Sequence, residues 1–129
     1  MQWTRETVVD VSNIDEVTPF VTKDGSQIRE LLSTRNSCIR QQSLAEARLP
    51  AGAATTPHYH ERTEEIYYIL HSAGQMRLGE VSRHVAAGDA IAIPPGVVHQ
   101  ITNTGSGTLT FLCCCAPAYE HDDTVLVDS

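Results

Sequence analysis

The chain has 129 residues, of which 41% are hydrophobic and 19% are charged. That length suits one domain, and such a chain buries roughly two thirds of its unfolded surface without needing disulfides or a structural metal. A net charge of −7 and the lack of a basic stripe argue against nucleic-acid binding. No apolar run is long enough to predict a transmembrane helix, and the charged opening MQWTRETVVD is unlike a secretory signal. We therefore expect a cytoplasmic protein.

The N-terminal third predicts an arm followed by two strands. Residues 1–24 alternate polar and apolar side chains only weakly, although their valines favour short strands (Val8, Val9, Val11, Val17 and Val21). A turn at residues 23–26 leads into a predicted strand at 28–33 and, after a loop, a second strand at 38–49. The segment SLAEAR within 38–49 also has helical propensity. We favour a strand, because the turn-forming residues 49–52 end it.

Seven further short strands follow, each bounded by glycine, proline or asparagine. They are predicted at 56–60, 65–71, 74–78, 82–85, 90–93, 98–103 and 108–115. This pattern is typical of an all-β sandwich or barrel, and no internal repeat indicates a second domain. The acidic segment 116–129 holds one apolar run, 125–127, which is either a last strand, on this chain or a partner subunit, or a surface segment.

Two histidines one residue apart, His58 and His60, are the most informative local feature. Alternate side chains of a strand point to the same face, so these imidazoles enter one volume, roughly 6.5–7 Å apart along the strand. Imidazole binds zinc, copper, iron and nickel. Glu64 and Glu65 follow on the next predicted strand and would add a carboxylate oxygen. The stretch 52–74 therefore indicates part of a metal site.

A second stretch at 88–103 completes a pair of motifs that resembles those of the cupin superfamily. In the first motif, a glycine is followed after five residues by His-x-His, then by a glutamate, and Gly52, His58 and His60 fit without adjustment. Every position of the second motif is filled, by Gly88, Pro94, Gly96, His99 and Asn103. One departure is Ser72, which stands where the family usually has glycine.

The resemblance implies a small single-domain metal-binding cupin of the cupin 2 type, with the family's conserved β-barrel. Its fold would be an all-β double-stranded β-helix, or jelly-roll barrel, spanning residues 1–129. We assign 1–27 to an N-terminal arm, 28–115 to the barrel core and 116–129 to a C-terminal tail. The implied metal ligands are His58, His60, Glu65 and His99. Glu64 stays open as the alternative carboxylate, although Glu65 matches the family's register.

Other residues are candidates on weaker grounds. Alternation from Glu65 places Tyr67 on the metal side, where it either lines a pocket or packs as a core aromatic. Arg77 and Gln42 are candidate substrate contacts, since a guanidinium pairs well with anions, but an exposed or structural role is open for both. The histidines outside the motifs are predicted to be surface residues (His71, His84 and His121). Asn103 is predicted to hold backbone near a turn.

The cysteines do not form a disulfide or zinc pattern. Cys113, Cys114 and Cys115 are consecutive, and only Cys38 is distant. Neighbouring strand residues face opposite sides, so at most one of the three could reach Cys38. We interpret the run as reduced thiols at the end of a strand, with a soft-metal or redox role as the alternative.

Together these features predict a protein that binds one divalent transition metal ion, namely manganese, iron, nickel or zinc. The family includes dioxygenases, decarboxylases, isomerases and lyases. The resemblance therefore implies a dioxygenase or an isomerase/lyase that acts on a small oxygenated organic acid or sugar. The alternative is a non-catalytic cupin that binds a small molecule or metal as sensor or store. We expect an anionic or polyoxygenated ligand, no nucleic-acid or membrane partner, and a homodimer that covers the apolar ends of the chain.

Overall fold

Inward-facing side chains alternate with outward-facing ones along the strands, as expected of sheets with one face on a core. Strand β5 (Glu64–His71) buries Glu65, Tyr67 and Ile69, whereas the residues between them are exposed. Strand β9 (His99–Asn103) likewise buries its first, third and fifth residues. Each strand therefore carries both polar and apolar side chains into the interior.

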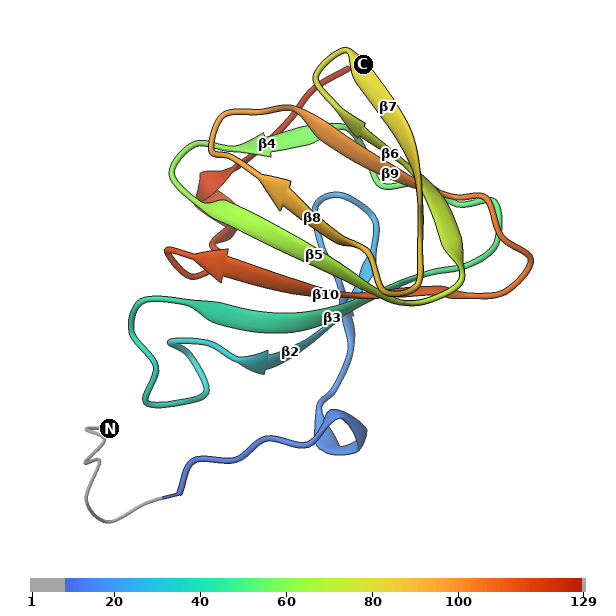
Figure 1. Cartoon of the computed structure of the whole chain (residues 1–129). Coiled ribbons are helices and arrows are strands. Elements are labelled where there is room, and N and C mark those ends of the chain that lie inside the picture. The colour runs from blue at the N-terminus through green and yellow to red at the C-terminus, as the bar shows by residue number, and fades with distance from the viewer. Residues whose placement is uncertain (1–8, 129) are drawn as a thin grey trace.

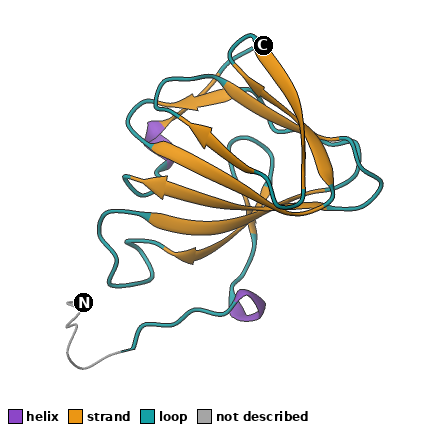
Figure 2. Cartoon of the chain, in the orientation of Figure 1, coloured by secondary structure: helices purple, strands orange, loops and turns teal. Residues whose placement is uncertain are grey.

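The computed structural model describes residues 9–128 and arranges their strands in two antiparallel sheets (Figure 1). The first sheet has the order β1-β2-β3-β10-β5-β8, and the second has the order β11-β4-β9-β6-β7. The remaining strands are β1 (Phe20–Val21), β2 (Gln27–Leu32), β3 (Ser43–Leu49), β4 (His58–His60), β6 (Ala73–Leu78), β7 (Val81–Ala86), β8 (Ala90–Ile93), β10 (Leu109–Ala116) and β11 (Thr124–Leu126). Apart from two short 3-10 helices, the described chain is strand and loop (Figure 2). The predicted all-β jelly-roll fold is confirmed.

The apolar core lies between the two sheets. Its largest fully buried side chains come from both of them, and include Phe111, Leu49, Ile69, Ile101 and Leu109. Asn103 ties this region to its loops, because its Nδ2 donates to the carbonyls of Leu49 (3.0 Å) and Gly107 (2.8 Å). The predicted backbone-holding role of Asn103 is thus confirmed.

The N-terminal expectations were only partly right. The predicted strand at 38–49 begins at Ser43, because residues 34–42 form turns in place of a sheet ladder. Val9 and Val11 lie outside any strand and are exposed, and the segment after them forms the 3-10 helix η1 (Ile14–Glu16). Val8 lies outside the described residues. The strand β1 at Phe20–Val21 nevertheless pairs with β2, so part of the expected arm belongs to a sheet.

At the other end of the chain, the apolar run near residue 125 forms a strand on this chain's own sheet. Strand β11 pairs with β4, and Thr124 lies opposite His60 in the register. The 3-10 helix η2 (His121–Asp123) precedes it. The three consecutive cysteines are free thiols near the end of β10, as predicted, and Cys38 is a free thiol as well. Among residues 9–128, no helix is both long and apolar enough to span a membrane.

Candidate metal centre

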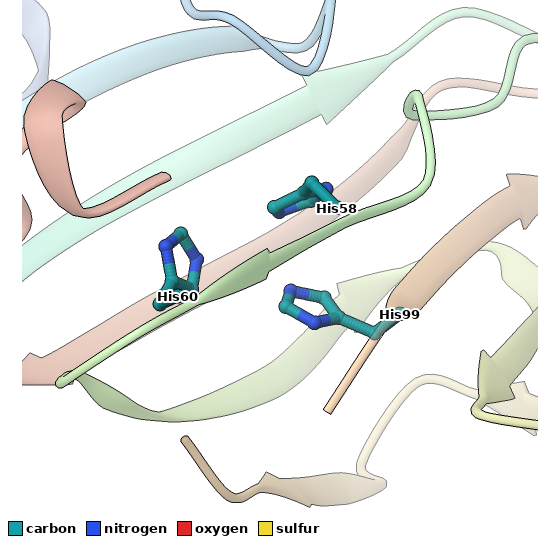
Figure 3. Close-up of side chains that lie close together, drawn as sticks. All are labelled: His58, His60 and His99. Carbon is teal, nitrogen blue, oxygen red and sulfur yellow. The ribbon is translucent and has the colours of Figure 1, made fainter. Parts of the chain in front are cut away.

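Strands β4 and β9 bring three histidines together. His58 and His99 are direct partners in the β4–β9 ladder, and His60 follows His58 on the same face. Their ligand atoms all lie within 4.8 Å of one another, and Figure 3 shows the three rings around one common space. All three side chains are buried. These histidines are positioned to bind a metal ion.

Each imidazole has its Nδ1 atom engaged by a neighbouring oxygen. Nδ1 of His58 lies 2.8 Å from the Thr56 carbonyl, and Nδ1 of His99 lies 3.0 Å from the Val97 carbonyl. A carbonyl only accepts, so Nδ1 carries the proton in both rings, which leaves Nε2 with a free lone pair. His60 Nδ1 contacts the hydroxyl of Thr124 at 3.1 Å, and that hydroxyl can donate to the Glu120 carbonyl. The surrounding residues thus favour the tautomer that a metal requires.

The electrostatics of the site keep His58 neutral. Burial lowers the pKa of His58, and the neighbouring His99 imidazole lowers it further, whereas the Asp24 carboxylate opposes both effects. A neutral imidazole is the form that binds a metal ion, because protonation occupies the lone pair. His58 is therefore ready to act as a ligand near neutral pH.

Glu65 enters the site from the opposite sheet, whereas Glu64 is exposed. The Oε1 atom of Glu65 lies 3.2 Å from His60 Nε2 and 3.6 Å from His99 Nε2. Its other oxygen, Oε2, accepts a hydrogen bond from the Cys115 thiol at 3.2 Å. Burial would raise the pKa of Glu65, but His60 and His99 in their protonated form outweigh it through hydrogen bonding and charge, and hold that pKa at about 2. Glu65 is thus a carboxylate at neutral pH.

Two buried atoms of this cluster have no hydrogen-bond partner among the described residues, namely Glu65 Oε1 and His99 Nε2. Leaving such groups unpaired costs free energy, on the order of 1–3 kcal/mol each and more for a charge. The nitrogen and the oxygen lie 3.6 Å apart, beyond hydrogen-bond distance, which suits two lone pairs that share a metal ion. A divalent cation would satisfy both, so the residues fit a metal ion. The mutual 4.8 Å cluster itself contains only the histidines.

A cavity lined by His58, His60 and Glu65 opens between the two sheets. It offers about 40 Å³ to the centres of water-sized molecules, and one water needs about 10–15 Å³ on that measure. Tyr67 and Tyr119 are among its lining residues, as are the thiols of Cys113 and Cys115. Gln42 and Arg77 do not line it: Gln42 is exposed, and the Arg77 guanidinium donates to the Gly79 carbonyl. Tyr67 alone of the three predicted candidates lies at the cavity.

The hydroxyls and thiols around the cavity stay protonated at neutral pH. Burial raises the pKa of Tyr119 to about 12, and it raises the pKa of Tyr67 well above its ordinary value. Burial also raises the pKa of Cys113 and of Cys115, and the Glu65 carboxylate raises both further. These side chains therefore line the cavity in their neutral forms. The cysteines lack the electropositive surroundings of a reactive thiolate.

Sequence reasoning missed two residues that the fold brings to the histidines. Asp24 lines the cavity with its Oδ2 atom 3.6 Å from His58 Nε2, and Thr124 supports His60. The sequence marks Asp24 only as part of the Lys23–Ser26 turn. Thr124 is 64 positions from its partner, so no local spacing connects them. The histidines outside the motifs are exposed as predicted (His71, His84 and His121).

Comparisons with known proteins agree with this geometry. The family model described as a cupin domain matches residues 45–115. An uncharacterized protein of Methanocaldococcus jannaschii is 46% identical over 114 residues, which cover 88% of this chain and 91% of that protein. The crystal structure of a predicted oxalate decarboxylase from Thermotoga maritima is similar at 30% identity, with a TM-score of 0.73, and the match covers 83% of this chain and 98% of that one.

A more distant structure shares the fold. The polyketide cyclase RemF from Streptomyces resistomycificus matches with a TM-score of 0.80 at 22% identity, over 95% of this chain and 87% of that chain. The family match covers more than half of the sequence, including both motifs and all three histidines. The chain therefore belongs to the cupin family.

Proposed function

We propose that this protein is a mononuclear, divalent-metal-dependent cupin enzyme of the isomerase/lyase type, acting on a small polyoxygenated molecule such as a sugar. The observation that carries the proposal is the convergence of three buried imidazoles and the Glu65 carboxylate beside a cavity. In this proposal His58, His60, His99 and Glu65 hold the ion. When bound, the ion would supply positive charge to a substrate oxygen that becomes anionic during proton transfer.

The cavity wall supports a polyoxygenated substrate over a highly charged acid. Among the described residues, no lysine or arginine lines the cavity, whereas Asp24, Glu30 and Glu65 do. An anionic substrate would therefore meet carboxylates without a guanidinium or ammonium partner other than the metal. Hydroxyl and carbonyl oxygens of a neutral molecule fit better, because such a wall both accepts and donates hydrogen bonds.

Tyr67 and Tyr119 are suited to position such a substrate. The Tyr67 ring packs against Phe111, with centroids 4.6 Å apart, and its hydroxyl makes no hydrogen bond to another described residue. The Tyr119 ring lies edge-on to His60, and its hydroxyl is within 3.2 Å of His121 Nδ1. Two fixed rings at the cavity can orient substrate oxygens without losing much side-chain entropy.

A proton-transfer assay tests this function. The Mn²⁺-loaded protein is incubated in D₂O with a panel of neutral sugars and hydroxy-ketones, and with oxalate as the acidic comparison. We expect ¹H NMR to show deuterium entering a carbon-bound position of a neutral compound, and no exchange with His99→Ala. Tyr67→Phe should slow the exchange while metal binding is kept. Oxygen consumption without exchange would instead support a dioxygenase, and ligand binding without turnover would support a sensor or store.

We also propose that the protein is a homodimer that pairs through the outer face of the six-stranded sheet. That face exposes Ile66 (50% exposed) and Tyr68 (41%) on β5, beside the partly buried side chains of Leu112, Cys114 and Leu44 in neighbouring register positions. A continuous apolar row on a sheet favours a self-complementary partner. Light scattering should give twice the 14.1 kDa chain mass, and Ile66→Lys should shift it toward one chain. A single chain at micromolar concentration would contradict the dimer.

A further inference from the structure

The turn between β1 and β2, residues 22–26, is held against the metal centre by contacts from both ends of the site. The Asp24 carbonyl accepts a hydrogen bond from Thr56 N (2.7 Å), just before the strand that carries His58. Lys23 Nζ donates to the carbonyls of His121 and Thr124, each at 3.0 Å. The turn is therefore fixed to the two segments that position His58 and His60.

The two oxygens of the Asp24 carboxylate differ in their surroundings. Oδ1 accepts three hydrogen bonds, from Thr22 Oγ1 (2.7 Å), Ser26 N (2.9 Å) and Ser26 Oγ (2.7 Å). Oδ2 accepts none from the described residues, and it lies 3.6 Å from His58 Nε2. The side chain is only 14% exposed. One oxygen therefore orients the carboxylate, and the other is left free at the imidazoles.

We propose that Asp24 is a second carboxylate donor of the metal centre, supplied by the β1–β2 turn. Glu65 lies against His60 and His99, whereas Asp24 lies against His58, so each Nε2 atom of the cluster faces a carboxylate oxygen. The buried, unpartnered atoms Glu65 Oε1 and His99 Nε2 indicate independently that a cation belongs at this point. This inference rests on the proposed metal site and adds a ligand to it.

A second carboxylate changes the charge of the loaded centre. Three neutral imidazoles, one carboxylate and a divalent ion leave a charge of about +1, and Asp24 lowers it to about zero. A neutral centre does not attract an anion by its net charge, which agrees with the lack of lysine and arginine among the described lining residues. The added hard oxygen also favours manganese or iron in a five- or six-ligand site over four-coordinate zinc. In this proposal Asp24 therefore favours manganese or iron over zinc, and a neutral substrate over an anionic one.

A purely structural role for Asp24 would need only Oδ1. Asparagine keeps an Oδ1 acceptor for Thr22 and Ser26, but its amide nitrogen replaces the oxygen that faces His58 and cannot bind a cation. Asp24→Asn therefore removes the proposed ligand while keeping the turn. Glu30→Gln is the matched control, because Glu30 also lines the cavity but its oxygens are engaged by Ser33 and Arg35.

The test measures Mn²⁺ affinity by competition with a chelator, the visible spectrum of the Co²⁺-substituted protein, and the melting temperature of the metal-free protein. We expect Asp24→Asn to weaken Mn²⁺ binding by about tenfold or more, and to shift the Co²⁺ spectrum toward the stronger absorption of a lower coordination number. Glu30→Gln should stay within about threefold of wild type and keep the wild-type spectrum. The metal-free melting temperature of Asp24→Asn should be close to that of wild type.

If Asp24→Asn lowers that melting temperature, the Thr22→Val/Ser26→Ala double variant separates metal binding by Asp24 from its stabilisation of the turn. It removes the hydroxyl donors to Oδ1 and keeps the carboxylate, so it should weaken the turn more than it weakens Mn²⁺ binding. Equal losses of affinity in this variant and Asp24→Asn would overturn the proposal, as would wild-type affinity and spectrum in Asp24→Asn. If the wild-type protein binds no Mn²⁺ through its histidines, the proposed metal-dependent function fails together with the proposed role of Asp24. If the wild-type protein binds Mn²⁺ and Asp24→Asn binds it equally well, only the proposed role of Asp24 fails.

Discussion

The two ends of the interior are built from the same strands but contain opposite chemistry. Along β5, the inward positions run from Glu65 through Tyr67 to Ile69, and along β9 they begin with His99 and continue with Ile101. The polar end holds imidazoles and carboxylates with unpartnered buried atoms, whereas the apolar end is a closed hydrophobic cluster. On β9, a shift of two residues therefore separates a side chain positioned to bind a metal ion, His99, from one that packs in the core, Ile101.

The arrangement shows how a small fold can contain a site whose buried polar groups destabilise it. Burying polar groups without partners is unfavourable, and the packed apolar end of the same strands offsets that cost. The account predicts that changes at the apolar end alter stability but not metal stoichiometry. Changes at the imidazoles should remove the bound metal, and with it the stability that the metal adds, while the stability of the metal-free protein changes little.

The largest stability effect is expected from Ile101→Ala. Ile101 is fully buried two residues from His99, and removal of a buried isoleucine side chain typically costs about 2–5 kcal/mol. Denaturant unfolding should show this loss, while metal analysis still finds one ion per chain. Val81→Ala, at a position that is 71% exposed, should change stability by less than about 0.5 kcal/mol. If Ile101→Ala folds but loses its bound metal, the prediction that the apolar end affects stability without affecting metal binding is wrong.

Asp123 is expected to have the next largest effect, because it holds the turn between His60 and Glu65. Its carboxylate, 2% exposed, accepts hydrogen bonds from Arg62 N (3.0 Å), Arg62 Nε (3.1 Å) and Thr63 N (3.0 Å). Asp123→Asn places an amide against one of these donors and should cost about 1–3 kcal/mol. Urea unfolding at neutral pH measures this loss.

The Asp123 effect should also depend on pH. Burial alone would raise the pKa of Asp123, but the hydrogen bonds from Thr63 and Arg62 outweigh it and lower that pKa below its unfolded value, about 3.9. The stabilisation is therefore fully present above that value and is lost as pH falls through the folded pKa. The stability gap between wild type and Asp123→Asn should shrink in acid, and a gap that widens would contradict this reading.

A smaller gain is expected from Ser72→Gly at the corner where the chain leaves β5 for the second sheet. Ser72 has a positive φ of 73°, in the left-handed region that glycine adopts at little cost. The family's usual glycine at this position thus has a conformational reason. Relief of the strain, less the extra freedom that glycine gives the unfolded chain, should leave about 0.5–1 kcal/mol of stabilisation. Thermal unfolding of Ser72→Gly against Ser72→Ala, which keeps the strain, measures it.

The sequence predicted those features that depend on local spacing. Strand alternation placed His58 and His60 on one face, because side-chain direction along a strand repeats every two residues. Glu65 was favoured over Glu64 by the register of the cupin motif, and the fold buries Glu65 and exposes Glu64. The two motifs likewise predicted the jelly-roll fold. The histidines outside the motifs were predicted to be surface residues because they match no motif position, and all three are exposed.

Features created by long-range contacts could not be predicted in this way. Asp24 and Thr124 reach the imidazoles only because the β1–β2 turn and β11 fold back onto β4. Gln42 and Arg77 were selected by side-chain chemistry alone, and the fold places both away from the cavity. Residues 38–42 had strand-like composition, but no neighbouring strand pairs with them in the described chain.

The most direct test of the central claim is the number of metal ions bound per chain, measured by elemental analysis after chelation, reloading with Mn²⁺ and dialysis. The account predicts one ion per wild-type chain, with a melting temperature that rises on reloading, since a ligand at about 100 times its Kd adds roughly 2.7 kcal/mol. His58→Ala, His60→Ala and His99→Ala should each lose the ion, and Glu65→Gln should lose more than Glu64→Gln. His71→Ala and His84→Ala should keep it. An unchanged melting temperature after verified metal removal, with no ion retained on reloading, would contradict the claim that this cluster is a metal centre.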